Sequence, residues 1–101
     1  MAQHDFSALY ALYPGIIDTM ESTFTSHQFI LKLAQAHQQL YVEALYAYRN
    51  NLHRRQPVPF MMVHKELARG LSQSNLVEYV REVDSKDIFG ESNRCGQWRK
   101  V

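Results

Sequence analysis

Apolar residues recur at helical spacing along most of the chain. Near the N-terminus, Phe6, Leu9, Tyr10 and Tyr13 follow the i, i+3, i+4, i+7 pattern of one helix face. The dipeptide that follows, Pro14-Gly15, is typical of a helix end. We therefore expect a short first helix, within a helical extension formed by residues 1–22.

The strongest local signal is a helix start at residue 25. With Thr25 as the N-cap, Gln28 stands at N3, which completes a capping box, and Phe24 and Phe29 form the hydrophobic staple around it. The apolar face continues as far as Tyr48. This pattern predicts one long helix over residues 26–50, a rod on the order of 35 Å.

Beyond that helix, Pro57 and Pro59 predict an extended connector. Helical spacing then predicts one helix over residues 60–71 and, with Ser72 as a cap, another over 73–83. The period changes after Asp84, so residues 84–101 are expected to form a β-hairpin that turns at 90–93. We expect Trp98 of this hairpin to lie mainly in the core, with a partner for its indole N–H.

The bulk composition suits one domain over residues 1–101, because 46% of the residues are hydrophobic. Residues 1–50 hold four acids and two bases, whereas residues 51–101 hold six acids and nine bases. An anionic partner would therefore meet the C-terminal half. A lone cysteine, no basic leader and no apolar run of about 20 residues favour a cytoplasmic protein without membrane contact.

The order of predicted elements resembles that of winged helix-turn-helix domains. The stretch KELARGLSQSNLVEYV shares its Glu-Leu-Ala run with many second helices of that family, and DIFGESNRCGQWRK resembles wing hairpins of small uncharacterised bacterial proteins. The resemblance implies a mainly α fold with a C-terminal β-hairpin, in which a winged-helix-like three-helix core carries an extra N-terminal helix. In it, Val58 would lie in a short strand, residues 60–71 would be the second helix, 73–83 the recognition helix and 84–101 the wing.

This resemblance implies a DNA-binding protein, and we expect a transcriptional regulator that acts as a dimer. The start of the recognition helix, at Asn75, would face base edges, and wing cations would contact phosphates. Two acids on the same helix, Glu78 and Glu82, would repel phosphates. The candidate DNA-binding residues are Lys65, Arg69, Gln73, Ser74, Asn75, Tyr79, Arg81, Lys86, Arg94, Arg99 and Lys100.

The alternative is a protein-interaction module on the same fold, without DNA binding. Tyr41, Tyr46 and Tyr48 supply more aromatic surface than a small core requires, which favours a homodimer through the long helix. The same tyrosines would otherwise lie at the rim of the core. The basic residues Arg49 and 53–55 fit a helix C-terminus better than a phosphate patch.

Enzyme chemistry has no sequence support. None of the five histidines forms a short metal-ligand pair, and the chain has no glycine-rich phosphate loop and no nucleophile elbow. We therefore expect neither a metal nor a cofactor. His64, on an apolar helix face, is expected to be a hydrogen-bonded core residue. Cys95 beside Arg94 fits a half-buried strand cysteine better than a reactive thiolate.

Overall fold

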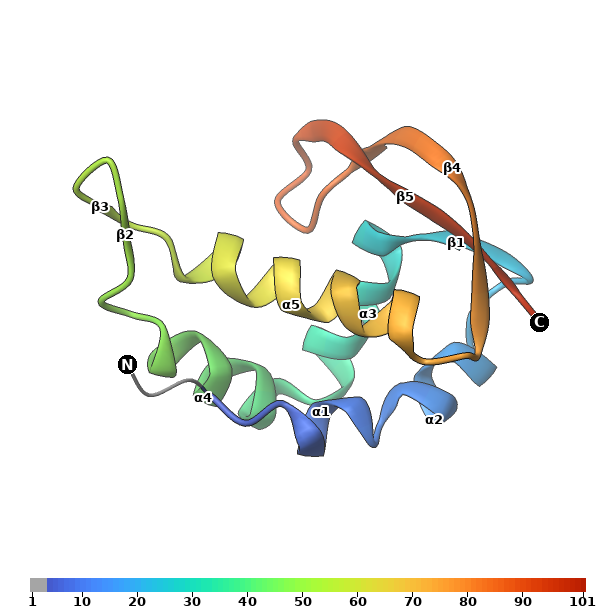
Figure 1. Ribbon diagram of the computed structural model, residues 1–101, viewed down its shortest axis with the longest axis horizontal. Coiled ribbons are helices and arrows are strands. Elements are labelled where there is room, and N and C mark those ends of the chain that lie inside the picture. Colours follow the sequence, from blue (N-terminus) through green and yellow to red (C-terminus); the bar gives the residue numbers. More distant parts are fainter. Residues whose placement is uncertain (1–3) are drawn as a thin grey trace.

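The computed structural model describes residues 4–101, in which helices pack under a small antiparallel sheet (Figure 1). The helices are α1 (Ser7–Tyr10), α2 (Tyr13–Asp18), α3 (Ser26–Ala36), α4 (Gln38–Ala47) and α5 (Pro59–Gln73). The strands are β1 (Thr23–Thr25), β2 (Leu52–His53), β3 (Gln56–Pro57), β4 (Val77–Lys86) and β5 (Ser92–Lys100). Figure 1 shows the β1, β4 and β5 sheet on one side of α5, with α1, α2 and α4 on the other.

The expectation of a mainly α fold with a single C-terminal hairpin is wrong. About 47% of the structure is helix and 27% is strand, so the domain is mixed α/β. Its main sheet has the order β1-β5-β4, and β5 is therefore the central strand. Within residues 4–101 there are five helices, where a three-helix core with one extra helix was expected.

The helix expected over residues 73–83 is a strand. The Ser72 hydroxyl donates to the Arg69 carbonyl instead of capping a new helix, and α5 runs on to Gln73. Asn75 then adopts a left-handed conformation, with φ of 62°, that turns the chain into β4. The segment after this turn, VEYVREV, is rich in β-branched and aromatic residues, which fit a strand that pairs with β5.

The hairpin expected at the C-terminus is present, with different bounds. Residues 94–100 are in β5, as predicted, but the hairpin begins at Val77 and not at residue 84. The chain reverses over residues 87–91 and not over 90–93, because the Asp87 carboxylate accepts the backbone N–H groups of Phe89 and Glu91. Gly90 supplies the left-handed conformation in this turn, with φ of 83°.

The single long helix expected over residues 26–50 is broken. His37 leaves the helical region, with φ of −132° and ψ of 59°, and separates α3 from α4. The change of direction brings Tyr41, Ala44 and Tyr48 of the second segment into the core. A straight rod would have carried them away from the rest of a small domain, so burial favours the break.

The proline connector is a two-stranded ribbon, β2–β3, and not a strand at Val58. Arg54 and Arg55 form its tip, and both have positive φ, at 52° and 68°. Figure 1 shows the ribbon projecting from the body of the domain, beyond the start of α5. Val58 is the N-cap of α5, and Pro59 begins the helix. Arg54 and Arg55 therefore do not stabilise a helix C-terminus. Arg49 does, because it donates to the Tyr46 carbonyl at 2.9 Å.

The predicted start of α3 is confirmed. The Gln28 amide N–H donates to the Thr25 hydroxyl at 3.2 Å, and the Thr25 amide N–H donates to the Gln28 side chain at 2.9 Å. Phe24 and Phe29 are both buried, with ring centroids 6.2 Å apart. Pro14, in contrast, lies in the first turn of α2 and does not simply end a helix.

The core lies where α3 and α5 meet the sheet and the N-terminal helices. Its fully buried side chains include Leu9, Tyr13, Phe24, Phe29, Leu33, Val63, Leu67 and Leu71. Trp98 is buried as expected, and its indole N–H donates to the Ser26 hydroxyl at 2.9 Å. The central strand is thereby tied to the first turn of α3.

Candidate functional site

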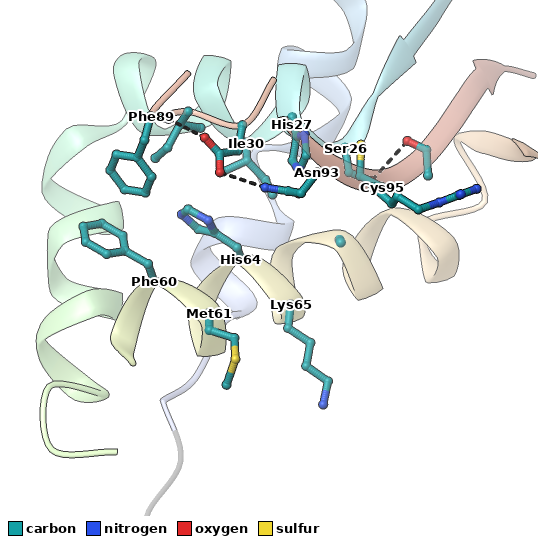
Figure 2. Close-up of a pocket in the computed structure, with 15 residues that line it drawn as sticks. Ser26, His27, Ile30, Phe60, Met61, His64, Lys65, Phe89, Asn93 and Cys95 are labelled. Carbon is teal, nitrogen blue, oxygen red and sulfur yellow. Dashed lines mark hydrogen bonds between the residues drawn. The ribbon is translucent and has the colours of Figure 1, made fainter. Parts of the chain in front are cut away.

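The predicted DNA-binding residues were expected on a second helix, a recognition helix and a wing. The structure places them on α5, in the turn that follows it, and on β4 and β5. Lys65 and Arg69 lie on α5 and are exposed. Figure 2 shows the Lys65 side chain leaving the helix away from the His64 ring. Lys65 makes no ion pair within residues 4–101, whereas Arg69 pairs with Glu66 at 2.9 Å.

Residues expected on a recognition helix lie at the end of α5 and on β4. Gln73 is the last residue of α5, and Ser74 caps that end by donating to the Leu71 carbonyl at 2.9 Å. Asn75 lies in the left-handed turn, so it cannot occupy the start of a helix that faces base edges. Tyr79 packs edge-on against Trp98, and Arg81 is exposed on β4.

Cross-strand ion pairs neutralise part of the hairpin. Arg94 lies 2.8 Å from Glu82, and Arg99 lies 2.6 Å from Glu78. Lys100 is half-buried and donates to the Asp18 carbonyl at 3.4 Å. Lys86, like Arg81, is exposed and forms no ion pair with any residue the structure describes. Of the four cations predicted to contact phosphates from the wing, only Lys86 is exposed and free of an ion pair within residues 4–101, because Lys100 is half-buried and Arg94 and Arg99 are paired.

The outward face of α5 contains no free carboxylate. Helical spacing places Met61, Lys65, Arg69 and Ser72 on this face, opposite the buried stripe. Glu66 turns toward the N-terminal helices, where it lies 3.5 Å from the Tyr10 hydroxyl and also pairs with Arg69. The face is therefore neutral to basic along its length.

A cleft of about 490 Å³ lies between α3, α5 and the β4–β5 turn (Figure 2). Its apolar walls come from Ile30, Phe60, Met61, Ile88 and Phe89. The Phe60 and Phe89 rings meet edge to face at the mouth, with centroids 4.8 Å apart, and 42% and 58% of the two residues remain exposed. A volume of this size is typical of small-molecule sites.

Two histidines stand in this cleft. The Tyr41 hydroxyl lies 2.6 Å from Nε2 of His64, which confirms the expectation of a hydrogen-bonded histidine. Burial, helped by the nearby His27, lowers the pKa of His64 to about 4, so its ring is neutral at pH 7. Nδ1 of His27 is buried and has no hydrogen-bond partner within residues 4–101.

The turn that closes the cleft is organised by Asp87. Besides two backbone N–H groups, its carboxylate accepts the Asn93 side-chain amide at 2.9 Å. These hydrogen bonds, led by that of Glu91, lower the pKa of Asp87 below its usual value. The carboxylate accepts three hydrogen bonds from within the turn and so holds the turn in shape.

The hydrogen-bonded His64 is the residue of this cleft whose environment was predicted from the sequence. The other walls of the cleft come from segments that are distant in the chain, near residues 26–30, 60–68 and 87–96. Only the folded arrangement brings them together. Cys95 lines the cleft and is half-buried. In the described part of the chain, no three His, Cys, Asp or Glu side chains are arranged to hold a metal ion.

Among the helices of residues 4–101, none is both long and apolar enough to span a bilayer. Comparisons with protein-family models, with curated proteins and with solved structures give no match to this chain.

Proposed function

We propose that the chain binds duplex DNA through the outward face of α5 and the ribbons on either side of it. The observation that carries the proposal is the outward face of α5, where the only nearby carboxylate, Glu66, is paired with Arg69 and where Lys65 lies at the centre. An α-helix fits the major groove of B-DNA, and a face without a free carboxylate repels the phosphates on either side of the groove less. The proposal implies a cytoplasmic transcriptional regulator.

The winged helix-turn-helix resemblance supports this assignment when it is applied to the observed elements. A short strand, β1, precedes α3, and α5 leads through one turn into the β4–β5 hairpin. In this arrangement α5 takes the place expected of residues 73–83, and the hairpin takes the place of the wing. Gln73, exposed at the end of α5, replaces Asn75 as the candidate for contacting a base edge.

Phosphate contacts are assigned to exposed cations that form no ion pair in the part of the chain that the structure describes. Arg81 and Lys86 on β4 are two of these cations. The other two, Arg54 and Arg55, lie at the tip of the β2–β3 ribbon, which precedes α5. Left-handed conformations at both ribbon arginines hold a tight turn that keeps the two side chains exposed. Arg94 and Arg99 contribute less, because Glu82 and Glu78 already neutralise them.

Single-lysine variants test the assignment of α5. Lys65→Ala should weaken binding to all duplex sequences alike and reduce the salt slope by about one, as for the loss of one phosphate contact. The matched control is Lys32→Ala, an exposed lysine on α3 beside α2. Equal loss of affinity in both variants, measured by fluorescence anisotropy, would remove α5 from the interface.

A homodimer is the second candidate function, on a specific observation. Val42 and Tyr46 lie one turn apart on α4 and are 58% and 63% exposed, and Leu52 of β2 is also exposed. Replacing Val42 and Tyr46 together by Ser should shift sedimentation at micromolar concentration from dimer to monomer. A wild-type chain that sediments as a monomer over this range would dismiss the dimer and leave the α5 proposal standing.

A further inference from the structure

The β2–β3 ribbon ends in two arginines whose backbone conformation is strained. The paired residues His53 and Gln56 flank a two-residue turn formed by Arg54 and Arg55, and both arginines have positive φ, at 52° and 68°. Positive φ at both central residues is the geometry of a type I′ turn, which asparagine and glycine normally occupy. The Cβ of arginine makes this conformation costly, and strained residues of this kind cluster at functional sites.

The sequence around this turn contains no acidic residue. The chain has no Asp or Glu between Glu43 and Glu66, a stretch that includes both arms of the ribbon. Arg54 and Arg55 are exposed, and neither forms an ion pair within residues 4–101. Two adjacent guanidinium groups without a nearby opposite charge fit the phosphates of a nucleic acid.

The ribbon carries the turn away from the body of the domain. The Val58 amide N–H closes its base by donating to the Asn51 carbonyl at 2.9 Å, and α5 begins at the next residue, Pro59. Figure 1 shows the ribbon projecting beyond this end of α5. At about 3.3 Å per residue, each arm holds the turn roughly 10 Å from the base.

This length is sufficient to pass from one groove of DNA to the next. The major groove is about 12 Å wide, so the phosphates that border it lie about 6 Å from its middle. With α5 in the major groove, a turn at the end of the ribbon has the reach to cross these phosphates. The arginine side chains then meet the adjacent minor groove.

We propose that Arg54 and Arg55 enter the minor groove of A·T-rich DNA, beside the major groove that α5 occupies. The inference rests on the proposed function and adds a sequence preference to it. A narrow A·T minor groove has an enhanced negative potential that attracts arginine, whereas G·C pairs place the N2 amino group of guanine in the groove. Inside the groove the two guanidinium groups lie between the phosphates of both strands, so they still displace counterions.

Duplexes that contain inosine–cytosine (I·C) pairs separate the contributions of the two grooves. An I·C pair has the major-groove edge of G·C, but it lacks the N2 amino group and therefore has the minor-groove edge of A·T. In fluorescence anisotropy at one salt concentration, alternating A·T and I·C duplexes should bind about tenfold more tightly than a G·C duplex of equal length. Equal affinity for the I·C and G·C duplexes would overturn this inference and leave the proposed function standing. Binding to none of the three duplexes would overturn both.

A charge-conserving variant tests the two arginines directly. The double variant Arg54→Lys, Arg55→Lys keeps both positive charges, so its affinity for the G·C duplex and its salt dependence should be retained. Its preference for I·C over G·C should fall below about twofold, because ammonium is more strongly hydrated than guanidinium and loses more on entering the groove. The matched control, Arg81→Lys on β4, should keep the tenfold preference. A double variant that also keeps it would overturn the inference.

Discussion

At the scale of single residues, the contact between Ser26 and Trp98 joins the start of α3 to the central strand β5. The indole N–H has the Ser26 hydroxyl as its partner, and both residues are buried. Ser26→Ala would leave that donor without an acceptor, and we expect a loss of about 1–3 kcal/mol in the free energy of unfolding. Chemical denaturation measures it, with the exposed Ser92→Ala as control. A loss no larger than that of the control would show that the bond is not stabilising.

His64 gives the molecule a defined dependence on pH. Its pKa is about 4 in the folded chain against an ordinary value of 6.5, so the unfolded chain binds the extra proton first. The free energy of unfolding should therefore fall by roughly 2–3 kcal/mol as the pH drops from about 6.5 to about 4, with no further loss from this residue below that range.

Denaturation curves at a series of pH values test this dependence. In His64→Gln the free energy of unfolding should fall much less between about pH 6.5 and 4 than in the wild type, because glutamine does not titrate. His53→Gln, on the exposed β2 strand, is the matched control and should keep the wild-type slope. The Asp87 carboxylate has a lowered pKa, so its contribution is lost only at lower pH and does not obscure the window. A His64 variant with an unchanged slope would refute the buried neutral histidine.

At the scale of elements, α5 depends on one glycine for its contact with the N-terminal helices. A Cβ added at Gly70 would lie 2.6 Å from a ring carbon of Tyr10 and 2.7 Å from the hydroxyl of Tyr13. Tyr13 is held in place, because it is buried and donates to the Leu67 carbonyl at 2.7 Å.

Gly70→Ala should therefore destabilise the protein, although the same change inside a helix normally stabilises by about 1 kcal/mol. We expect a net loss of about 1–2 kcal/mol from overpacking, measured by denaturant unfolding. Gly15→Ala is the control, because an added Cβ there meets no atom within 4 Å and the residue lies in α2. An increase in stability for Gly70→Ala would mean that Tyr10 and Tyr13 do not pack closely against this position of α5.

Local sequence signals predicted some helices and buried residues correctly. Pairing between strands determined the elements that were predicted wrongly. The capping box at Thr25, the buried Trp98 and the helix from residue 59 to 73 depend on neighbours in sequence or on plain hydrophobicity. Val77, Val80 and Val83 suit a helix face and a strand equally, and pairing with β5 selected the strand. Helical spacing alone could not distinguish these outcomes.

The candidate cleft could not be predicted from the sequence, because its residues are far apart in the chain. His64 was expected to be hydrogen-bonded, but its partner, Tyr41, is 23 residues away. His27 is adjacent to the predicted start of α3 and gave no signal of its own. His27 lies near His64 because α3 packs against α5, a contact between segments that are far apart in the chain, and the β4–β5 turn then closes the cleft.

At the scale of the whole molecule, the distribution of charge is more informative than the total. The net charge is only +1, yet five exposed cations that form no ion pair within residues 4–101 lie on α5, on β4 and on the tip of the β2–β3 ribbon: Lys65, Arg81, Lys86, Arg54 and Arg55. Others lie elsewhere, such as Lys32 on α3. Binding of a polyanion to such a surface releases counterions, and its affinity then falls steeply with salt. The same surface would bind a neutral protein partner with little dependence on salt.

The most direct test is the affinity of the wild-type chain for mixed-sequence duplex DNA as a function of salt. If Lys65, Arg54, Arg55, Arg81 and Lys86 contact phosphates, fluorescence anisotropy should give a plot of log affinity against log salt with a slope between about −3 and −5. Absence of binding at low ionic strength, or binding that salt does not weaken, would contradict DNA recognition by α5 and its flanking ribbons.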